Sequence, residues 1–404
     1  MKQGYLSQYF KGVAAKKLSS TEADVGTSNQ HEFNGVAALK GIFGEERKTF
    51  QAQFVYLNDE DDEPVTDTGF LTWYDARENH PVRTEYRMYY PTTAVSVCAA
   101  AGDDLFIGVR PDNSVLVVVS EHGSTVGNQL RWLLGFGEER LPIFSVRGEL
   151  EGERDRIAFS SRFILERLGI PVDEDANIFL EEMLHRFDGA FPGTKEFSEY
   201  ARSTVKDVQP LDDPDAVLMS WMEREEILFR TLEKHLILER LKNGFEGDVD
   251  GFLTYSLSVH NRRKRRVGQA LENHIEKLLT EWHIRYDRGK VTEGTSRSDF
   301  IFPGIFEYRN PVFDASFLTM LGVKSTCKDR WRQVLSEAKR IEAKHLLTLE
   351  AAVSENQTAE MQTNNLQLVV PESLHSTYTA KQKKWLMNVF SFIEYVQWKQ
   401  KVSP

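Results

Sequence analysis

The chain has 404 residues, a length that favours two domains, each large enough to bury its own hydrophobic core. Hydrophobic residues make up 41% and charged residues 27% of the sequence, and we expect neither a signal sequence nor a membrane-spanning apolar run, so we predict a cytoplasmic protein with no membrane role. The net charge of −11 argues, as an average, against a protein that binds nucleic acid.

The acidity belongs to the first half of the chain. Residues 1–200 carry 20 basic and 33 acidic side chains, whereas residues 201–404 carry 30 and 28. The second half contains an uninterrupted run of five cations at 262–266, of which Arg262, Arg263 and Lys264 are our candidate DNA contacts. We expect this run near the start of a helix, where it either meets a phosphate backbone or forms a solvated helix face. The average charge therefore conceals a basic segment.

Residues 1–150 alternate short apolar runs with polar turns, a pattern that predicts a β-barrel or sandwich. The expected strands are 50–57, 69–74, 84–90, 94–99, 104–109 and 114–119. Helical periodicity follows at 155–167 and 175–186. Proline-containing turns mark residues 188–213 as a linker. We therefore predict an N-terminal domain over residues 1–187 and a C-terminal domain over residues 214–404.

The C-terminal domain is predicted to be an α/β domain with a mixed sheet, which makes the whole chain a two-domain protein of the α+β and α/β classes. Amphipathic helices are expected at 214–243 and from about 265 to 283. Then come strands at 299–303 and 320–324, a helix at 329–345, strands at 345–349 and 366–371, and a closing helix at 381–399.

Three polar residues of this domain form a candidate active site. Asp299 begins a strand, Lys324 ends the next strand, and Glu337 lies about two turns into the helix that follows. Hydrolysis of a phosphodiester uses carboxylates that hold a divalent cation and a positive group near the attacked phosphorus, and these residue types supply both. The spacing by itself is more often that of structural salt bridges.

The candidate site departs from a common pattern at Gly322. A nuclease of the PD-(D/E)xK type normally carries an acidic residue two positions before the lysine, and glycine occupies that position here. On the predicted helix, Glu337 points back towards the sheet and can replace the missing carboxylate. Mg²⁺ keeps several of its waters, so two protein ligands, Asp299 and Glu337, suffice.

A candidate base-reading segment follows the catalytic lysine. Lys328, Asp329 and Arg330 alternate in charge at the expected start of a helix. Lysine or arginine can donate to guanine and aspartate can accept from cytosine in the major groove, so the segment suits a G:C pair. An aspartate at that place is equally typical of a helix cap.

Residues 258–373 closely resemble the catalytic domain of EcoRII-type restriction endonucleases. The resemblance rests on VHNRRK at 259–264, SDFIFP at 298–303, VKSTCKDRWRQ at 323–333 and LVVP at 368–371. It implies a Mg²⁺-dependent PD-(D/E)xK nuclease with Asp299, Lys324 and Glu337 as the catalytic set, and Glu272 matches a further family glutamate near the metal. It also implies that the 328–330 segment reads the C:G pairs of a site beginning with CC, such as CCWGG.

The N-terminal half resembles the same family more loosely. Residues 74–77 and 83–87 are similar to one DNA-reading arm of the family's effector domain, a β-pseudobarrel, and residues 16–19 and 28–35 fall where the other arm is expected. The resemblance offers as contacts Lys17, Asn29, Gln30, His31, Arg77, Arg83, Glu85 and Arg87. Arginine and glutamate on alternating strand positions are also typical of a solvated face with cross-strand pairs.

The sequence therefore predicts a type II site-specific deoxyribonuclease that binds double-stranded DNA and makes double-strand breaks. Cleavage of both strands of a near-palindromic site favours a homodimer. The resemblance implies a bacterial enzyme paired with a cognate DNA methyltransferase, in which the N-terminal domain inhibits the nuclease until it binds a second copy of the site. Two alternatives remain: a modification-dependent endonuclease whose N-terminal domain reads a methylated base, and a catalytically silent DNA-binding regulator.

Overall fold

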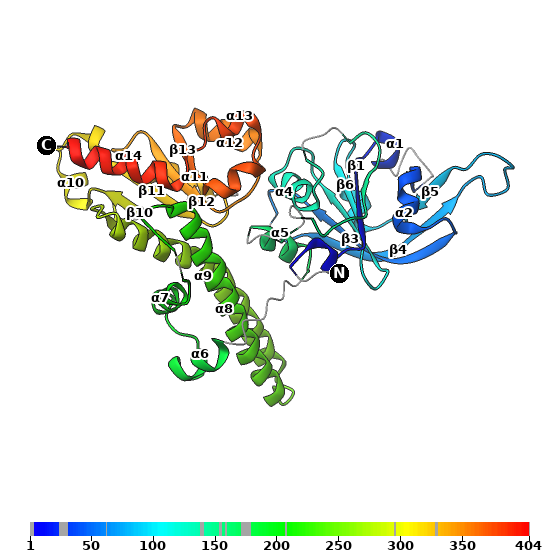
Figure 1. The fold of residues 1–404 in the computed structure, drawn as a ribbon, viewed down its shortest axis with the longest axis horizontal. Coiled ribbons are helices and arrows are strands. Elements are labelled where there is room, and N and C mark those ends of the chain that lie inside the picture. Colours follow the sequence, from blue (N-terminus) through cyan, green and yellow to red (C-terminus); the bar gives the residue numbers. More distant parts are fainter. Residues whose placement is uncertain are drawn as a thin grey trace. The chain divides into compact units, whose positions relative to one another are not determined.

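The computed structural model describes residues 4–403 except 24–30, 62, 138–140, 153–155, 158–159, 171–178, 207, 295 and 328–329. The chain divides into two compact units (Figure 1). Unit 1 comprises Met1–Val172 with Ala352–Glu355, and unit 2 comprises Asp173–Ala351 and Asn356–Pro404. No helix in the described ranges is long and apolar enough to cross a lipid bilayer.

Unit 1 is built on one eight-stranded mixed sheet. Across the sheet the strands are β2 (Glu32–Asn34), β5 (Tyr86–Tyr89), β4 (Val65–Asp75), β3 (Lys48–Leu57), β7 (Val115–Ser120), β6 (Asp104–Val109), β1 (Gly12–Lys17) and β8 (Ser145–Arg147). Neighbours are antiparallel except β3 and β7. Five of the six predicted strands are present, and the short strands β1, β2 and β8 were not predicted.

The sixth predicted strand, at 94–99, is instead a helix, α3 (Ala94–Cys98). Thr93 and Ser96 form a reciprocal capping box: the Thr93 hydroxyl accepts from the Ser96 backbone amide at 3.0 Å, and the Ser96 hydroxyl accepts from the Thr93 amide at 2.9 Å. The valines of this segment favour a strand, but satisfying two free amides at the helix start outweighs that preference.

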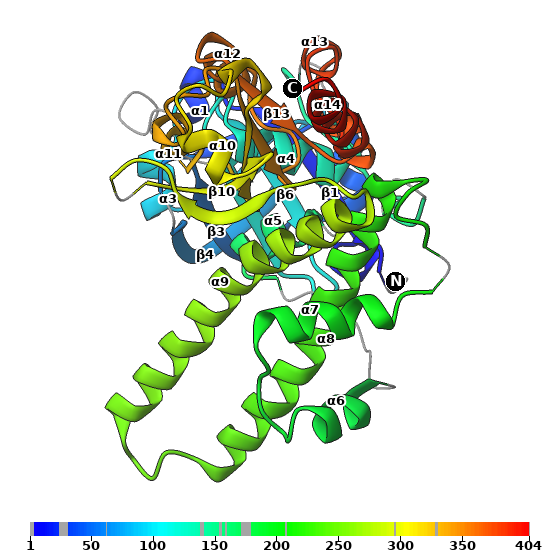
Figure 2. The same ribbon diagram turned by 90° about the vertical axis from the view of Figure 1, so that its left-hand side faces the viewer.

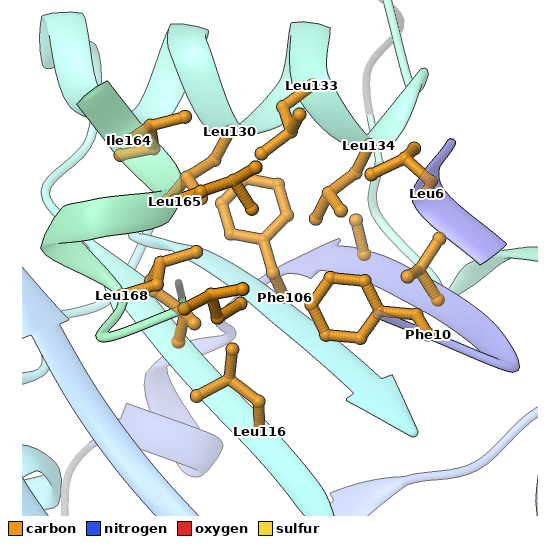
Figure 3. Packing of buried hydrophobic residues seen from close by; sticks show 14 of the residues in the cluster. Leu6, Phe10, Phe106, Leu116, Leu130, Leu133, Leu134, Ile164, Leu165 and Leu168 are labelled. Carbon is orange, nitrogen blue, oxygen red and sulfur yellow. The ribbon is translucent and has the colours of Figure 1, made fainter. Parts of the chain in front are cut away.

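The sheet of unit 1 carries a hydrophobic core on each face. The remaining helices of the unit are η1 (Leu6–Gln8), α1 (Ser20–Ala23), η2 (Ala37–Leu39), α2 (Lys40–Phe43), α4 (Thr125–Leu134) and α5 (Ser161–Arg167). Figure 3 shows α4 and α5 packing leucine and isoleucine side chains on Phe106 and Leu116. On the other face, Trp73 and Phe50 pack against Phe43 of α2. Strands β6 and β7 are buried at every position because both faces are covered.

Unit 2 contains a mixed sheet, as predicted, and the sheet has five strands, of which β9 was not predicted. Its order is β13 (Leu366–Val369), β12 (Lys344–Thr348), β11 (Thr319–Lys324), β10 (Arg297–Phe302) and β9 (Asp287–Val291). Strands β11, β12 and β13 are parallel, and β9, β10 and β11 are antiparallel. Every residue of β12 is buried, as is typical of a central parallel strand.

Two predicted helices of unit 2 are shorter than expected. The remaining small helices are α10 (Ile305–Arg309), η5 (Ala315–Phe317), α11 (Arg330–Ser336), α12 (Glu355–Thr363), η6 (Glu372–Thr377), α13 (Ala380–Lys383) and α14 (Val389–Val402). The helix expected over 329–345 ends at Ser336, because Ala338 adopts a φ of +46° and leaves the helical path. The closing helix is divided into α13 and α14, because Met387 bridges to Val369 and Asn388 caps α14.

Two long helices, α8 (Pro214–Asn243) and α9 (Val249–Glu281), run side by side as an antiparallel hairpin (Figure 2). Asp248 caps α9, so this helix begins well before the expected start near residue 265. The cationic run 262–266 therefore lies in mid-helix. The residues expected as a linker, 188–213, contain α7 (Thr194–Ser203), which packs with α6 (Leu180–Arg186) and α8 in one apolar cluster.

Asp215 joins the start of α8 to the start of α14. Its buried carboxylate accepts three backbone hydrogen bonds, from Glu372 at 3.0 Å, Val389 at 2.9 Å and Phe390 at 2.8 Å. Two of these amides are the first of α14, where a carboxylate also meets the positive end of the helix dipole.

We expect Asp215→Ala to lower the free energy of unfolding by about 3 kcal/mol, because three buried amides lose a charged acceptor. Urea unfolding of the full chain measures this loss. The matched control is Asp212→Ala, at an exposed aspartate three residues earlier. Equal stability of the two variants would contradict the role given to Asp215.

Candidate active site

The antiparallel pairing of β10 and β11 brings Asp299 and Lys324 together. Phe300 lies opposite Leu321, so the Asp299 side chain faces the end of β11. Its Oδ2 atom accepts from the Lys324 ammonium at 2.7 Å and from the Val323 backbone amide at 2.7 Å. The side chains of Asp299 and Lys324 are 18% and 19% exposed, so both are shielded yet reachable from solvent.

Glu337 approaches the same point from the end of α11. It directly follows the last helical residue, Ser336, and only 8% of it is exposed. Burial and, after it, the nearby negative charge of Asp299 raise the pKa of Glu337 to about 7, although Lys324 and Lys344 oppose the shift. Its Oε2 atom is buried with no hydrogen-bond partner. A buried, unpaired carboxylate oxygen beside a second carboxylate suits a cation.

The close packing of α11 explains why glycine stands two positions before the lysine. A Cβ atom at Gly322 would lie 2.8 Å from Cγ2 and 3.1 Å from Cγ1 of Val334. The strand position that carries an acid in PD-(D/E)xK nucleases is therefore filled here by a helix side chain. The same contact holds α11 against the sheet, and Glu337 directly follows the last residue of this helix.

Glu272 reaches the site from α9. Burial and the charge of Asp299 raise its pKa, and the Arg288 guanidinium, 3.0 Å away, opposes the shift. Arg288 also donates to Asn273 at 2.9 Å and to Glu276 at 2.8 Å. The structure thus brings the other three predicted catalytic residues, Lys324, Glu337 and Glu272, near Asp299. Sequence reasoning missed Arg288, because strand β9 was not predicted, and it missed Lys344.

No group of three or more His, Cys, Asp or Glu side chains within the described residues is arranged to bind a metal ion. Asp299 is engaged by Lys324, and Glu272 by Arg288. Asp299 and Glu337 nevertheless fit a hard divalent cation, because both are oxygen donors and Glu337 keeps an unpaired oxygen.

Most residues of the basic run 262–266 form ion pairs or ring contacts with other residues of unit 2. The Arg262 guanidinium lies 4.0 Å from the centre of the Phe191 ring, and Arg263 pairs with Glu233 at 2.7 Å. Arg266 is buried against Glu225 and Glu226. Lys264 is exposed. Three of the five cations therefore stabilise the packing around the hairpin.

Of the predicted base-reading segment, Lys328 and Asp329 lie outside the described residues. Arg330 is the first residue of α11 and is exposed. It follows Lys324 by six residues in the sequence.

In unit 1, the predicted arm on β4 and β5 forms an ion-pair network. Glu85 pairs with Arg77 at 2.5 Å and with Arg87 at 2.5 Å, and Arg87 pairs with Glu32 of β2 at 2.7 Å. The hydrogen bonds from the two arginines lower the pKa of Glu85. Arg83 is exposed in the loop between the strands.

The described residues of the second predicted arm, Lys17 and His31, form separate contacts and not one ion-pair network. The Lys17 ammonium lies 2.6 Å from His122 Nδ1 and 3.6 Å from Asp104. His31 stacks edge-on against Tyr90 with a ring separation of 5.7 Å. Asn29 and Gln30 lie outside the described residues.

We expect the raised pKa of Glu337 to make stability depend on pH in metal-free buffer. The unfolded chain loses the proton near pH 4.5 and the folded chain near pH 7, so the fold loses stability as pH rises between them. Glu337→Gln removes this penalty and should gain about 2 to 3 kcal/mol over wild type above pH 7.

Urea unfolding at pH 5 and pH 8 measures the gain. Glu342→Gln, at an exposed glutamate five residues later, is the control and should follow wild type at both values. A constant difference between Glu337→Gln and wild type across this range would contradict the burial of an ionisable carboxylate.

Comparison with known proteins finds the same family that the sequence motifs of residues 258–373 resemble. Residues 229–393 match a family model described as EcoRII C terminal. Over 204 residues the chain is 41% identical to the type II restriction enzyme EcoRII of Escherichia coli. That alignment covers 50% of this chain and 50% of the enzyme, so the match spans about half the length of the curated relative.

Two solved structures match part of the chain at low similarity. One is metal-depleted Ecl18kI in complex with uncleaved, modified DNA, with a TM-score of 0.44 and 17% identity over 57% of this chain and 85% of that chain. The other is a restriction endonuclease PspGI–substrate DNA complex, with a TM-score of 0.41 and 16% identity over 56% of this chain and 93% of that chain. The sequence comparisons confirm that the C-terminal part of this chain is similar to the C-terminal domain of EcoRII, the family that its motifs resemble.

Proposed function

We propose that the chain is a type II restriction endonuclease that cuts both strands of DNA at a short specific site. The observation that carries this proposal is that the Lys324–Asp299 pair and the unpaired buried oxygen of Glu337 lie together beside the end of the central strand β11. The similarity of residues 229–393 to the EcoRII C-terminal domain supports it.

Asp299 and Glu337 would hold a divalent cation, which we propose is Mg²⁺, and the bound cation would supply charge neutralisation and an acidified water. Lys324 keeps a positive charge beside Asp299 and stabilises negative charge that develops on the phosphate. Glu272 lies next to this pair and is oriented by Arg288. The low exposure of all these groups strengthens their interaction with a phosphate.

We assign DNA reading in unit 2 to Lys328, Asp329 and Arg330, at a site that begins with CC and resembles CCWGG. The enzyme would act as a homodimer in the bacterial cytoplasm, alongside a cognate methyltransferase that protects the cell's own sites. Unit 1 would be a β-pseudobarrel effector domain. A pseudobarrel requires the sheet to curve until its two edges approach each other. The contact between the edge strand β8 and η2 supports this curvature, because η2 directly follows β2, the strand at the opposite edge.

Asp299→Ala and Lys324→Ala should each abolish cleavage, lowering the rate at least about 1,000-fold, because each removes charge stabilisation from the transition state. Cleavage of genomic DNA with Mg²⁺, followed by sequencing of the ends, gives the site. Fluorescence anisotropy on that site should show retained binding. The control Lys381→Ala, at an exposed lysine of α13, should cut normally. Cutting by either active-site variant at close to the wild-type rate would refute the catalytic assignment.

The effector role of unit 1 predicts a preference for DNA with two sites. We expect the full chain to cut a two-site plasmid about tenfold faster than a one-site plasmid, because a second site on the same molecule is present at high effective concentration. Arg87→Ala should remove this preference, since Arg87 organises the predicted arm. Lys11→Ala, at an exposed lysine of unit 1, is the control. Equal rates on the two plasmids for the wild-type chain would exclude inhibition by unit 1.

A further inference from the structure

Three side chains of α9 bind one guanidinium beside the candidate site. Arg288 of β9 donates from Nε and Nη2 to Glu272, at 3.2 Å and 3.0 Å. From Nη1 it donates to Asn273 at 2.9 Å and to Glu276 at 2.8 Å. A guanidinium is planar and its N–H groups point in fixed directions, so acceptors on two of its sides fix its orientation. The direction of Arg288 is therefore set by α9.

Asn273 connects this guanidinium to α7, which lies beside α9 (Figures 1 and 2). Its Oδ1 atom accepts from Arg288, and its Nδ2 atom donates to the Ser198 hydroxyl at 3.1 Å. That hydroxyl donates to the Thr194 carbonyl at 2.9 Å, so it meets the amide as an acceptor. Because a guanidinium only donates, the amide satisfies both neighbours in one orientation. Asn273 thus joins α7 to Arg288 with both ends of its amide.

The contacts of Asn273 are better shielded from water than the other contacts of Arg288. Only 4% of Asn273 is exposed and Ser198 is fully buried, whereas the side chains of Glu272 and Glu276 are 26% and 24% exposed. Shielded hydrogen bonds are stronger than exposed ion pairs. Glu272 and Glu276 lie one helical turn apart, so without Asn273 the guanidinium can turn to Glu276 and release Glu272. The buried amide therefore decides which carboxylate Arg288 holds.

We propose that Asn273 is a positioning residue of the candidate active site. Anchored to Ser198, it fixes Arg288, and Arg288 in turn holds the Glu272 carboxylate near Asp299. Asn273 acts through Arg288 and not on the reacting groups themselves. The inference rests on the proposed function, because the orientation of Glu272 affects a rate only if the site hydrolyses DNA.

The first experiment measures cleavage by the full chain. Asn273→Ala should lower kcat at least about tenfold and leave KM for DNA within about twofold of wild type, because a small displacement of an active-site carboxylate slows the reaction without weakening DNA binding. The matched control is Gln382→Ala on α13, which also removes a buried amide that donates to a hydroxyl, that of Thr358 at 3.0 Å. Equal kcat values for the two variants overturn the inference.

The second experiment separates positioning from a general loosening of the fold. Because Asn273 acts through Arg288, Asn273→Ala should slow single-turnover cleavage no further in a chain that already carries Arg288→Ala. If the two losses of rate multiply instead, Asn273 acts elsewhere and the inference is overturned.

A third variant covers the case in which Asn273→Ala does not fold. Ser198→Ala removes only the hydroxyl that anchors Asn273, and it should lower kcat about threefold with KM unchanged, as expected for one lost hydrogen bond. Circular dichroism checks that this variant is folded. A wild-type kcat in folded Ser198→Ala overturns the anchoring through α7.

Urea unfolding tests the same contacts without DNA. The losses of stability in Asn273→Ala and Arg288→Ala should be less than additive in the double variant, since the two residues share a hydrogen bond. If the losses are coupled but the wild-type chain cuts no DNA, the proposed function is wrong and the anchor stands. If the wild-type chain cuts DNA and the losses simply add, the nuclease stands and the anchor is wrong.

Discussion

The candidate active site depends on holding carboxylates close together in a largely buried position. Burial and, after it, the charge of Asp299 raise the pKa of both Glu337 and Glu272, because three acids lie close together out of water. Lys324 and Arg288 offset part of this cost through direct contacts at 2.7 Å and 3.0 Å. The Oε2 atom of Glu337 remains buried without a hydrogen-bond partner, which is unfavourable, and a bound cation would stabilise it. Carboxylates held together in this way lower the stability of the fold and favour the binding of a cation.

The packing of α11 on β11 makes this arrangement possible. Val334 occupies the space that a side chain at position 322 would need, so no strand residue can supply the third acid. The helix then ends at Ser336, and Arg340 anchors the following chain by donating to the carbonyls of Asn310 at 2.9 Å and Phe313 at 2.8 Å. The carboxylate of Glu337 thus enters the site from the loop after a helix, while its position relative to Lys324 is fixed by core packing.

The cationic residues of α9 differ in their surroundings along the helix. Arg263 and Arg266 pair with buried glutamates of α8, and their removal would leave less of that buried negative charge compensated. Lys264, between them in sequence, points elsewhere because successive helical residues are 100° apart.

The sequence alone determined most strands of both sheets, because its apolar runs identified five strands of unit 1 and four of unit 2. The residue types of Asp299, Lys324 and Glu337 predicted phosphodiester hydrolysis. Only the tertiary structure decided where partners far apart in sequence meet. Glu32 pairs with Arg87, and Glu233 with Arg263, and no local pattern reports such pairs. The start of α9, the end of α11 and the helical state of residues 94–98 were likewise decided by caps and packing. Periodicity reports which face of an element is buried, whereas the contacts of that face depend on the assembled fold.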